Sequence, residues 1–187
     1  SPATVLWDIP AVFTTSLGET FYAPTNYDKK FHGPVTARTA LANSYNVPAV
    51  RLYSQVGAQR AVHTAHAMGI TDLNDPLSEY GPSLVLGSQD VKLLDMVSVY
   101  HTLANEGRYR EPTPYQTMET TGGLLITADY RPAQQAISPE TAFQVTSMLS
   151  DREARRPMFG SAYNMTLSIP ATAKTGTTDS YRDNWTI

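Results

Sequence analysis

The residues best suited to chemistry lie near the carboxyl end of the chain, in the run Lys174-Thr175-Gly176-Thr177. Glycine has no side chain, so the backbone of a bound peptide can lie against an extended segment at that point. The lysine adds a positive charge, and the threonine hydroxyls can donate hydrogen bonds to a carboxylate. Lysine and threonine are also common on exposed sheet edges, so the run alone fits either a peptide-binding strand or an ordinary edge.

A second polar group, Ser44-Tyr45-Asn46, follows the end of a predicted helix. The serine and the asparagine are two positions apart at the helix end and can direct polar groups into one cleft. Both residue types also cap helices, which is their commoner use. The triplet alone therefore does not distinguish a site from a cap.

The composition limits the chemistry that is available. The 187 residues carry a net charge of −3, with 41% hydrophobic and 17% charged residues, which is typical of one globular domain or a piece of one. The absence of cysteine excludes a disulfide framework, an iron–sulfur cluster and a cysteine nucleophile. There is no basic excess for nucleic acid and no apolar run near the roughly 20 residues of a membrane span. His63 and His66 have metal-ligand spacing but no third ligand nearby, so we expect neither a metal nor a cofactor.

A mixed set of elements must position these residues, and we predict an α+β fold. The first 35 residues read as irregular chain with short extended pieces. We expect helices from about Thr36 to Asn43, from Pro48 to Gly57, from Gln59 to Met68, from a cap at Ser88 to Gly107, and from a cap at Ser138 with Pro139 in the first turn. Short strands are predicted around Gly122-Gly123, and an antiparallel hairpin is predicted from residues 171–178 and 185–187.

Other polar side chains receive structural interpretations. Asp95 is expected on a solvated face of its helix, and His32 and His101 at the surface or in caps. The cluster Arg152, Arg155 and Arg156 is expected in solvent, paired with Asp151 or Glu153.

Together and in this order, the two motifs resemble part of the motif set of penicillin-binding proteins and serine β-lactamases, namely S-x-x-K, an S-D-N-type triad and K-T-G. Longer blocks resemble the transpeptidase domain of bifunctional class A penicillin-binding proteins: residues 22–28, 31–36, 40–50, 83–87, 104–107 and 173–178. Residues 151–160 and Arg182-Asp183-Asn184-Trp185 resemble the C-type subgroup of that class. The resemblance covers nearly the whole chain.

The resemblance implies a penicillin-binding protein or serine β-lactamase-like fold and a serine-type D,D-transpeptidase that crosslinks peptidoglycan stem peptides and is trapped by β-lactams. Carried over by motif, Ser44 transfers a proton to the leaving nitrogen, Asn46 holds the donor amide, and Lys174 stabilises negative charge and hydrogen-bonds Ser44. Thr175 and Thr177 bind the terminal carboxylate, with Gly176 between them, and the Thr177 N–H forms half of the oxyanion hole. These roles require that positions 44 and 174 converge on one pocket.

One departure from the family pattern matters. No serine in the chain is followed three residues later by lysine, so the S-x-x-K nucleophile is missing from this sequence. We therefore interpret residues 1–187 as part of one transpeptidase domain with both ends cut, lying in a parent chain that also carries a glycosyltransferase domain. The resemblance places this segment outside the cytoplasm, either in the periplasm or at the outer face of the cytoplasmic membrane. It implies a membrane-anchored parent, with no membrane contact by this segment.

Two alternatives stay open. A non-catalytic module that holds cell-wall peptides or a partner fits the missing nucleophile. A related D,D-carboxypeptidase or β-lactamase fits the two short motifs, although residues 22–28 argue against it.

Overall fold

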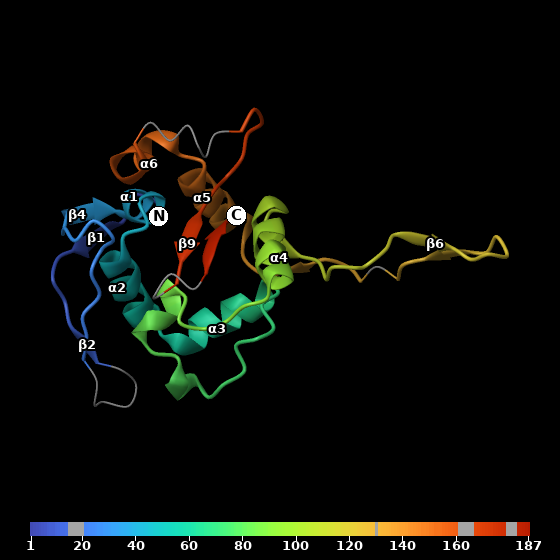
Figure 1. Cartoon of the computed structure of the whole chain (residues 1–187), viewed down its shortest axis with the longest axis horizontal. Helices are drawn as coiled ribbons and strands as arrows, with labels where there is room; N and C mark the ends of the chain where they lie inside the picture. The colour runs from blue at the N-terminus through green and yellow to red at the C-terminus, as the bar shows by residue number, and fades with distance from the viewer. Residues whose placement is uncertain (15–20, 130, 161–166, 179–182) are drawn as a thin grey trace.

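The structure is a computed structural model that describes residues 1–14, 21–129, 131–160, 167–178 and 183–187. Its helices surround a small hairpin near the middle of the molecule, and a second hairpin projects far from the body (Figure 1). The helices are α1 (Ala37–Ala42), α2 (Asn46–Val56), α3 (Ala58–Ala67), α4 (Leu93–Ala104), α5 (Pro139–Leu149) and α6 (Arg152–Phe159), with short 3₁₀ turns η1 (Leu77–Glu79) and η2 (Pro82–Leu86). The mixture of helices and short antiparallel strands agrees with the predicted α+β class.

The strands of the described residues form two-stranded antiparallel pairs. They are β1 (Val5–Asp8) with β4 (Gly33–Thr36), β2 (Phe13–Thr14) with β3 (Phe21–Tyr22), β5 (Arg108–Tyr109) with β8 (Gln134–Gln135), β6 (Thr117–Glu119) with β7 (Leu125–Thr127), and β9 (Thr175–Thr177) with β10 (Asn184–Thr186). The short strands predicted around Gly122-Gly123 and the hairpin predicted near the carboxyl end are both present.

The apolar core lies between α3, η2 and α4. Val62, Ile70, Leu73 and Tyr80 are buried at its centre, and Met96 and Val99 of α4 pack against them. Helix α2 joins this core through the Tyr53 hydroxyl, which donates a hydrogen bond of 2.8 Å to the Tyr80 carbonyl oxygen. Burial of these side chains fixes α2 and α4 relative to one another.

Helix α4 begins later than the sequence indicated, at Leu93 rather than just after Ser88. The Lys92 N–H donates to Asp72 at 3.1 Å, and Asp95 accepts bonds from the N–H and hydroxyl of Thr71 at 2.7 and 2.6 Å. Asp95 is buried, so its expected place on a solvated face is wrong. A partner from residues 71–72 thus sets the start of the helix, which a local capping pattern does not reveal.

Helix α6 was not predicted. Asp151 caps it by accepting a bond of 2.9 Å from the Ala154 N–H, and Arg156 pairs with Glu153 at 3.4 Å as expected. Arg155, by contrast, is buried, so the prediction of a wholly solvated arginine cluster is wrong. Its guanidinium donates to the Leu149 and Ala173 carbonyl oxygens, which replaces the lost water and ties α5 and α6 to the start of β9.

Candidate active site

Ser44 lies in the turn that ends α1, in the left-handed backbone region with φ of 58°. Its N–H donates to the Leu41 carbonyl oxygen at 3.2 Å, and the Tyr45 N–H donates to the Ala40 carbonyl oxygen at 3.0 Å. These two bonds form a Schellman motif, in which glycine usually occupies the position that Ser44 holds here. A serine therefore stands at a conformation that costs a residue with a side chain about 1–2 kcal/mol.

Lys174 immediately precedes β9, and its backbone continues the pairing of β9 with β10. Lys174 and Ile187 exchange two backbone bonds of 2.8 and 3.1 Å, and the Thr178 N–H donates to the Asp183 carbonyl oxygen at 3.1 Å. The N–H groups of successive residues in a strand point alternately to its two sides. Those of Lys174 and Thr178 point toward the β10 side, so those of Thr175 and Thr177 point away from β10. Within the described residues no strand pairs with this edge of β9, so the edge can accept a further extended peptide.

The two motifs meet in space. The Lys174 ammonium donates a hydrogen bond of 2.7 Å to the Ser44 hydroxyl oxygen and another of 2.5 Å to the Thr175 carbonyl oxygen. The pKa of Lys174 is lowered from 10.5 to about 8, chiefly by burial and in addition by the nearby positive charge of Arg155. The site therefore holds a desolvated cation against a hydroxyl.

The hydroxyl and the cation open into a pocket of about 700 Å³. Its polar side contains all six residues singled out in the sequence: Ser44, Asn46, Lys174, Thr175, Gly176 and Thr177. Its apolar side is lined by η2, the segment after it, α4 and β10, through Val85, Leu86, Val91, Met96, Tyr100 and Trp185. This volume and this mixture of surfaces are typical of a ligand site.

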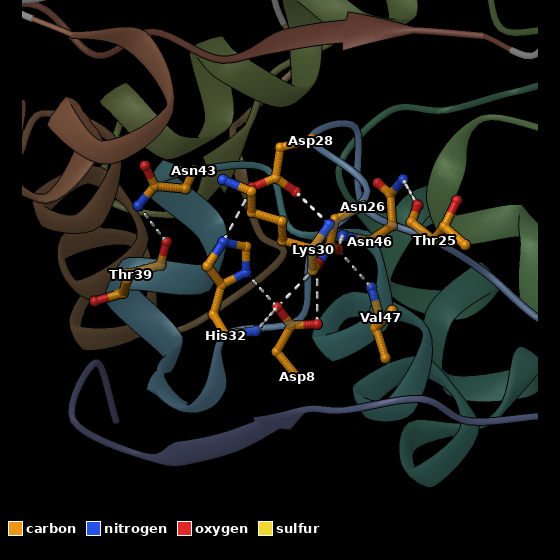
Figure 2. A network of polar contacts seen from close by, with 10 residues as sticks. All are labelled: Asp8, Thr25, Asn26, Asp28, Lys30, His32, Thr39, Asn43, Asn46 and Val47. Atoms are coloured by element: carbon orange, nitrogen blue, oxygen red, sulfur yellow. Dashed lines mark hydrogen bonds and ion pairs between the residues drawn. The ribbon is translucent and has the colours of Figure 1, made fainter.

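Asn46 stands at the start of α2 beside the pocket. Its side-chain amide donates to the Thr25 carbonyl oxygen at 2.8 Å, and its backbone N–H donates to the Asn26 side-chain oxygen at 2.9 Å (Figure 2). Residues 25–26 therefore hold Asn46 at both its backbone and its side chain.

Sequence reasoning missed several side chains around the site. The burial of Arg155 could not be predicted because its partners are two backbone carbonyl oxygens, which every residue type carries. His32, expected at the surface or in a cap, has its ring nitrogens 2.6 Å from Asp8 and 3.1 Å from Asp28 and stacks on Tyr45. In the sequence, the group of Asp8, Asp28 and His32 was indicated only by the blocks of residues 22–28 and 31–36 that resemble the family.

The histidine pair on α3 is not arranged for metal. The His66 ring nitrogens lie 2.8 and 2.9 Å from the carbonyl oxygens of Ile70 and Leu73, which engages them in the local backbone. Over the described ranges, no group of three or more potential metal-binding side chains gathers at one point.

The arrangement is suited to binding a peptide with a terminal carboxylate and to proton transfer at the Ser44 hydroxyl. The chain matches the family model of the penicillin binding protein transpeptidase domain over residues 13–186, and it belongs to this family. It is 32% identical over 166 residues to penicillin-binding protein 1B of Haemophilus influenzae, across 89% of this chain and 21% of that relative. The predicted resemblance to class A penicillin-binding proteins is thereby confirmed.

Solved structures share the fold. The D,D-transpeptidase domain of a peptidoglycan glycosyltransferase from Eggerthella lenta superposes with a TM-score of 0.75 at 20% identity, covering 100% of this chain and 51% of that one. Penicillin-binding protein A from Mycobacterium tuberculosis, solved as an imipenem acyl-enzyme complex, gives a TM-score of 0.76 at 19% identity, covering 100% and 46%. These likenesses concern the fold alone and agree with the predicted transpeptidase fold.

The chain spans only 21% and 24% of the length of two of its curated relatives, so it corresponds to a part of such proteins. Among the helices in the described part of the chain, none is both long and apolar enough to span a membrane.

Proposed function

We propose that this chain supplies the substrate-binding half of a serine-type D,D-transpeptidase that crosslinks peptidoglycan stem peptides. In this reaction a serine oxygen attacks the carbonyl of the penultimate D-alanine, and the terminal D-alanine leaves with a proton on its nitrogen. An amine of a second stem peptide then attacks the acyl-enzyme, forms the new amide bond and releases the serine. A β-lactam follows the first step and stays attached to the serine.

The single observation that carries this proposal is the bond of 2.7 Å between the Lys174 ammonium and the Ser44 hydroxyl, on the wall of the pocket. In the proposed reaction Ser44 passes the proton to the leaving nitrogen, and Lys174 stabilises the negative charge that develops next to it. Asn46 holds the donor amide. A cation that is desolvated interacts more strongly with such charge than one in water.

The open edge of β9 binds the donor peptide in this proposal. The hydroxyl groups of Thr175 and Thr177 donate hydrogen bonds to the terminal carboxylate, and Gly176 lets the donor backbone approach the strand. The Thr177 N–H, which points away from β10, forms half of the oxyanion hole. Losing one oxyanion-hole donor typically lowers the rate by about 10²–10³-fold.

The nucleophile comes from an S-x-x-K segment that is not among these 187 residues. We therefore propose that the chain acts within a longer protein, one that also carries a glycosyltransferase domain and works at the outer face of the cytoplasmic membrane. Its ligands are stem peptides and β-lactams, and no metal or cofactor takes part. Residues 1–187 alone form no acyl-enzyme in this proposal.

Labelling by a fluorescent penicillin tests the proposal. The longer protein should be labelled covalently, its Ser44→Ala variant should be labelled about 10²-fold more slowly, and the 187-residue chain alone should not be labelled. Covalent labelling of the isolated chain, or full-rate labelling of Ser44→Ala, contradicts the proposed roles.

A second candidate function is a non-catalytic module that binds cell-wall peptides, and the lack of any S-x-x-K in the sequence favours it. The reading frame that encodes the chain separates the two. An upstream serine–lysine pair supports the enzyme, whereas a longer protein without such a pair, which binds stem peptides but takes no penicillin label, supports the module.

A further inference from the structure

A buried polar cluster contacts the Ser44-Tyr45-Asn46 turn through Tyr45 and Asn46. We call Asp8, Asn26 and His32 the Asp8 cluster; they come from β1, from the segment after β3 and from the residue before β4 (Figure 2). Asp8 and Asn26 are 0% and 1% exposed. The Asp8 carboxylate accepts bonds from the Asn26 amide at 3.0 and 2.8 Å and from the His32 N–H at 3.0 Å. A buried carboxylate with this many donors is a specific and rigid contact.

Asn26 uses its whole amide group. The amide nitrogen donates to both Asp8 oxygens and, at 2.7 Å, to the Lys30 carbonyl oxygen. The amide oxygen accepts from the backbone N–H groups of Asn46 at 2.9 Å and Val47 at 3.4 Å. These N–H groups begin α2, whose N-cap residue, Tyr45, makes no side-chain capping bond. Asn26 therefore caps the helix from a distant point in the sequence, a role that the residue before a helix usually fills.

The cluster and its neighbours also hold the two residues that follow Ser44. The His32 ring stacks on the Tyr45 ring, with centroids 4.0 Å apart and planes 12° from parallel. The Asn46 amide is held by the carbonyl oxygen of Thr25, the residue before Asn26. Thus contacts to residues 25–32 hold Tyr45 and Asn46, and Figure 2 shows those made to Asn46.

These contacts help to hold Ser44 in its left-handed conformation. Ser44 has a left-handed backbone conformation, which a non-glycine residue keeps only when its surroundings hold it there. Helix α1 supplies two hydrogen bonds on one side of the turn, and Asn26 supplies the fixed start of α2 on the other. A serine that must meet Lys174 at hydrogen-bond distance depends on both.

We infer that Asp8 and Asn26 are positioning residues for acyl transfer. They act by holding the Ser44-Tyr45-Asn46 turn through the Asn26 cap on α2. This inference rests on the proposed function. Neither residue lines the pocket or touches the groups expected to react. Loss of either residue lowers the rate of the step in which Ser44 and Asn46 take part, beyond any loss of stability.

The first experiment compares two variants of the longer protein that each lose buried hydrogen bonds at α2. Asn26→Ala removes the cap, and Tyr53→Phe removes the bond of 2.8 Å to Tyr80 at the other half of the helix. Rapid-mixing kinetics with a fluorescent penicillin separate the rate constant of acylation from the dissociation constant of the preceding complex. We expect Asn26→Ala to lower the acylation rate constant by about 10–100-fold, because small displacements of reacting groups cost that much. Tyr53→Phe, which removes one buried hydrogen bond at α2, should change it by less than about 2-fold.

The second experiment is a rescue. Asn26→Asp places two carboxylates in contact, and Asp8→Asn removes an acceptor, so each should slow acylation. Combining the two restores one amide–carboxylate pair and keeps an oxygen to cap Asn46, but it sets a carboxylate oxygen against the Lys30 carbonyl oxygen in place of the donated bond. The double variant should therefore acylate faster than either single variant. If Asn26→Ala does not fold, this comparison carries the test.

Hydrogen exchange provides a readout that needs no reaction. Exchange at the amides of residues 45–47 should be faster in Asn26→Ala than in the parent protein and unchanged in Tyr53→Phe. Unchanged exchange at these amides, equal acylation in Asn26→Ala and Tyr53→Phe, or a double variant no better than its parents would each overturn the inference. If instead Ser44→Ala acylates at the full rate, the proposed function fails, while the exchange result still decides whether Asn26 holds the turn.

Discussion

Ser44 combines two properties that seldom occur together in one residue. It has the positive φ of 58° that terminates a helix with a Schellman motif, and it carries the hydroxyl that meets Lys174. Glycine suits the first property and cannot provide the second. Residues kept in an unfavourable backbone conformation are concentrated at functional sites. The backbone geometry at position 44 is therefore an indication of function independent of the sequence motif.

Replacing Ser44 by glycine and by alanine separates the two properties. Both variants lose the hydroxyl, so both should show the same large loss of penicillin labelling in the longer protein. Only alanine keeps a side chain at positive φ, so Ser44→Gly should be more stable than Ser44→Ala by about 1 kcal/mol. Chemical denaturation of both variants measures this difference. Equal stabilities would contradict the assignment of strain to this position.

The buried ammonium of Lys174 makes stability depend on pH in a defined direction. Its pKa is lowered to about 8 in the folded chain, chiefly by burial, against 10.5 ordinarily. Between these pH values the unfolded chain binds the proton and the folded chain does not, so the free energy of unfolding rises with pH. Below this window the full cost of burying the charge is present, about 3 kcal/mol.

Lys174→Met removes this dependence. The difference in free energy of unfolding, variant minus parent, should be largest below pH 8. It should decrease by about 3 kcal/mol as the pH approaches 10.5. Urea denaturation at a series of pH values measures it. Lys29→Met, which removes an exposed ammonium, is the control. A pH profile for Lys174→Met that matches the control would mean that the Lys174 ammonium is not desolvated.

At the scale of elements, the buried side chain of Asn43 links α1 to α6. The Asn43 amide nitrogen donates to the carbonyl oxygens of Thr39 at 2.9 Å and Ala154 at 2.6 Å, and its oxygen accepts from the Met158 N–H at 3.0 Å. Asn43 is 1% exposed. The residue next to Ser44 thus connects the turn to the helix that carries Arg155.

Asn43→Ala should lower the free energy of unfolding by about 2 kcal/mol, because it removes a buried side chain and leaves partly buried backbone groups of α6 without partners. Asn74→Ala, which removes an exposed bond to the Thr71 carbonyl oxygen, should cost well under 1 kcal/mol. Thermal or chemical denaturation of the two variants makes the comparison. Similar losses in both would show that the link between α1 and α6 adds little.

The elements that could be predicted are those whose signals are local. Helix α5 has its cap at Ser138 and its first-turn proline, and α2 ends at Gly57, as the sequence indicated. The start of α4 and the burial of Arg155 could not be predicted, because their partners lie elsewhere in the chain or are backbone groups. Capping rules describe only the nearest few residues, so such tertiary contacts override them without warning.

At the scale of the whole molecule, the projecting hairpin stands apart from the site. Strands β5 and β8 form its base at the body, and β6 and β7 lie near its tip (Figure 1). All residues of β6 and β7 are exposed, as is Leu124 beside them. Two strands that contact only one another are marginally stable in water.

The hairpin should therefore be the first target of limited proteolysis in the described part of the chain. Chymotrypsin should cut near Leu124 and Leu125 well before it cuts at Leu149, which is buried in α5. Mass spectrometry of timed samples identifies the order of cleavage. Earlier cleavage within α2 or α5 would contradict this expectation.

The convergence of positions 44 and 174 was predictable from the resemblance to a family and not from periodicity or composition. No local pattern relates a helix end to a strand 130 residues later. The same is true of Asn26 and Asn46, which belong to different elements and meet only in the folded chain. Local physics therefore predicted the parts of the site, and the family resemblance predicted their assembly.

The distance of 130 residues along the chain between Ser44 and Lys174 also has a consequence during synthesis. At about 5–20 residues per second, a ribosome adds the lysine roughly 6–26 seconds after the serine. Throughout that interval the nascent polypeptide already contains the Ser44 turn but lacks the cation that completes the pocket. A polypeptide that stopped just before Lys174 would consequently keep Ser44 and Asn46 but lack β9 and the second motif.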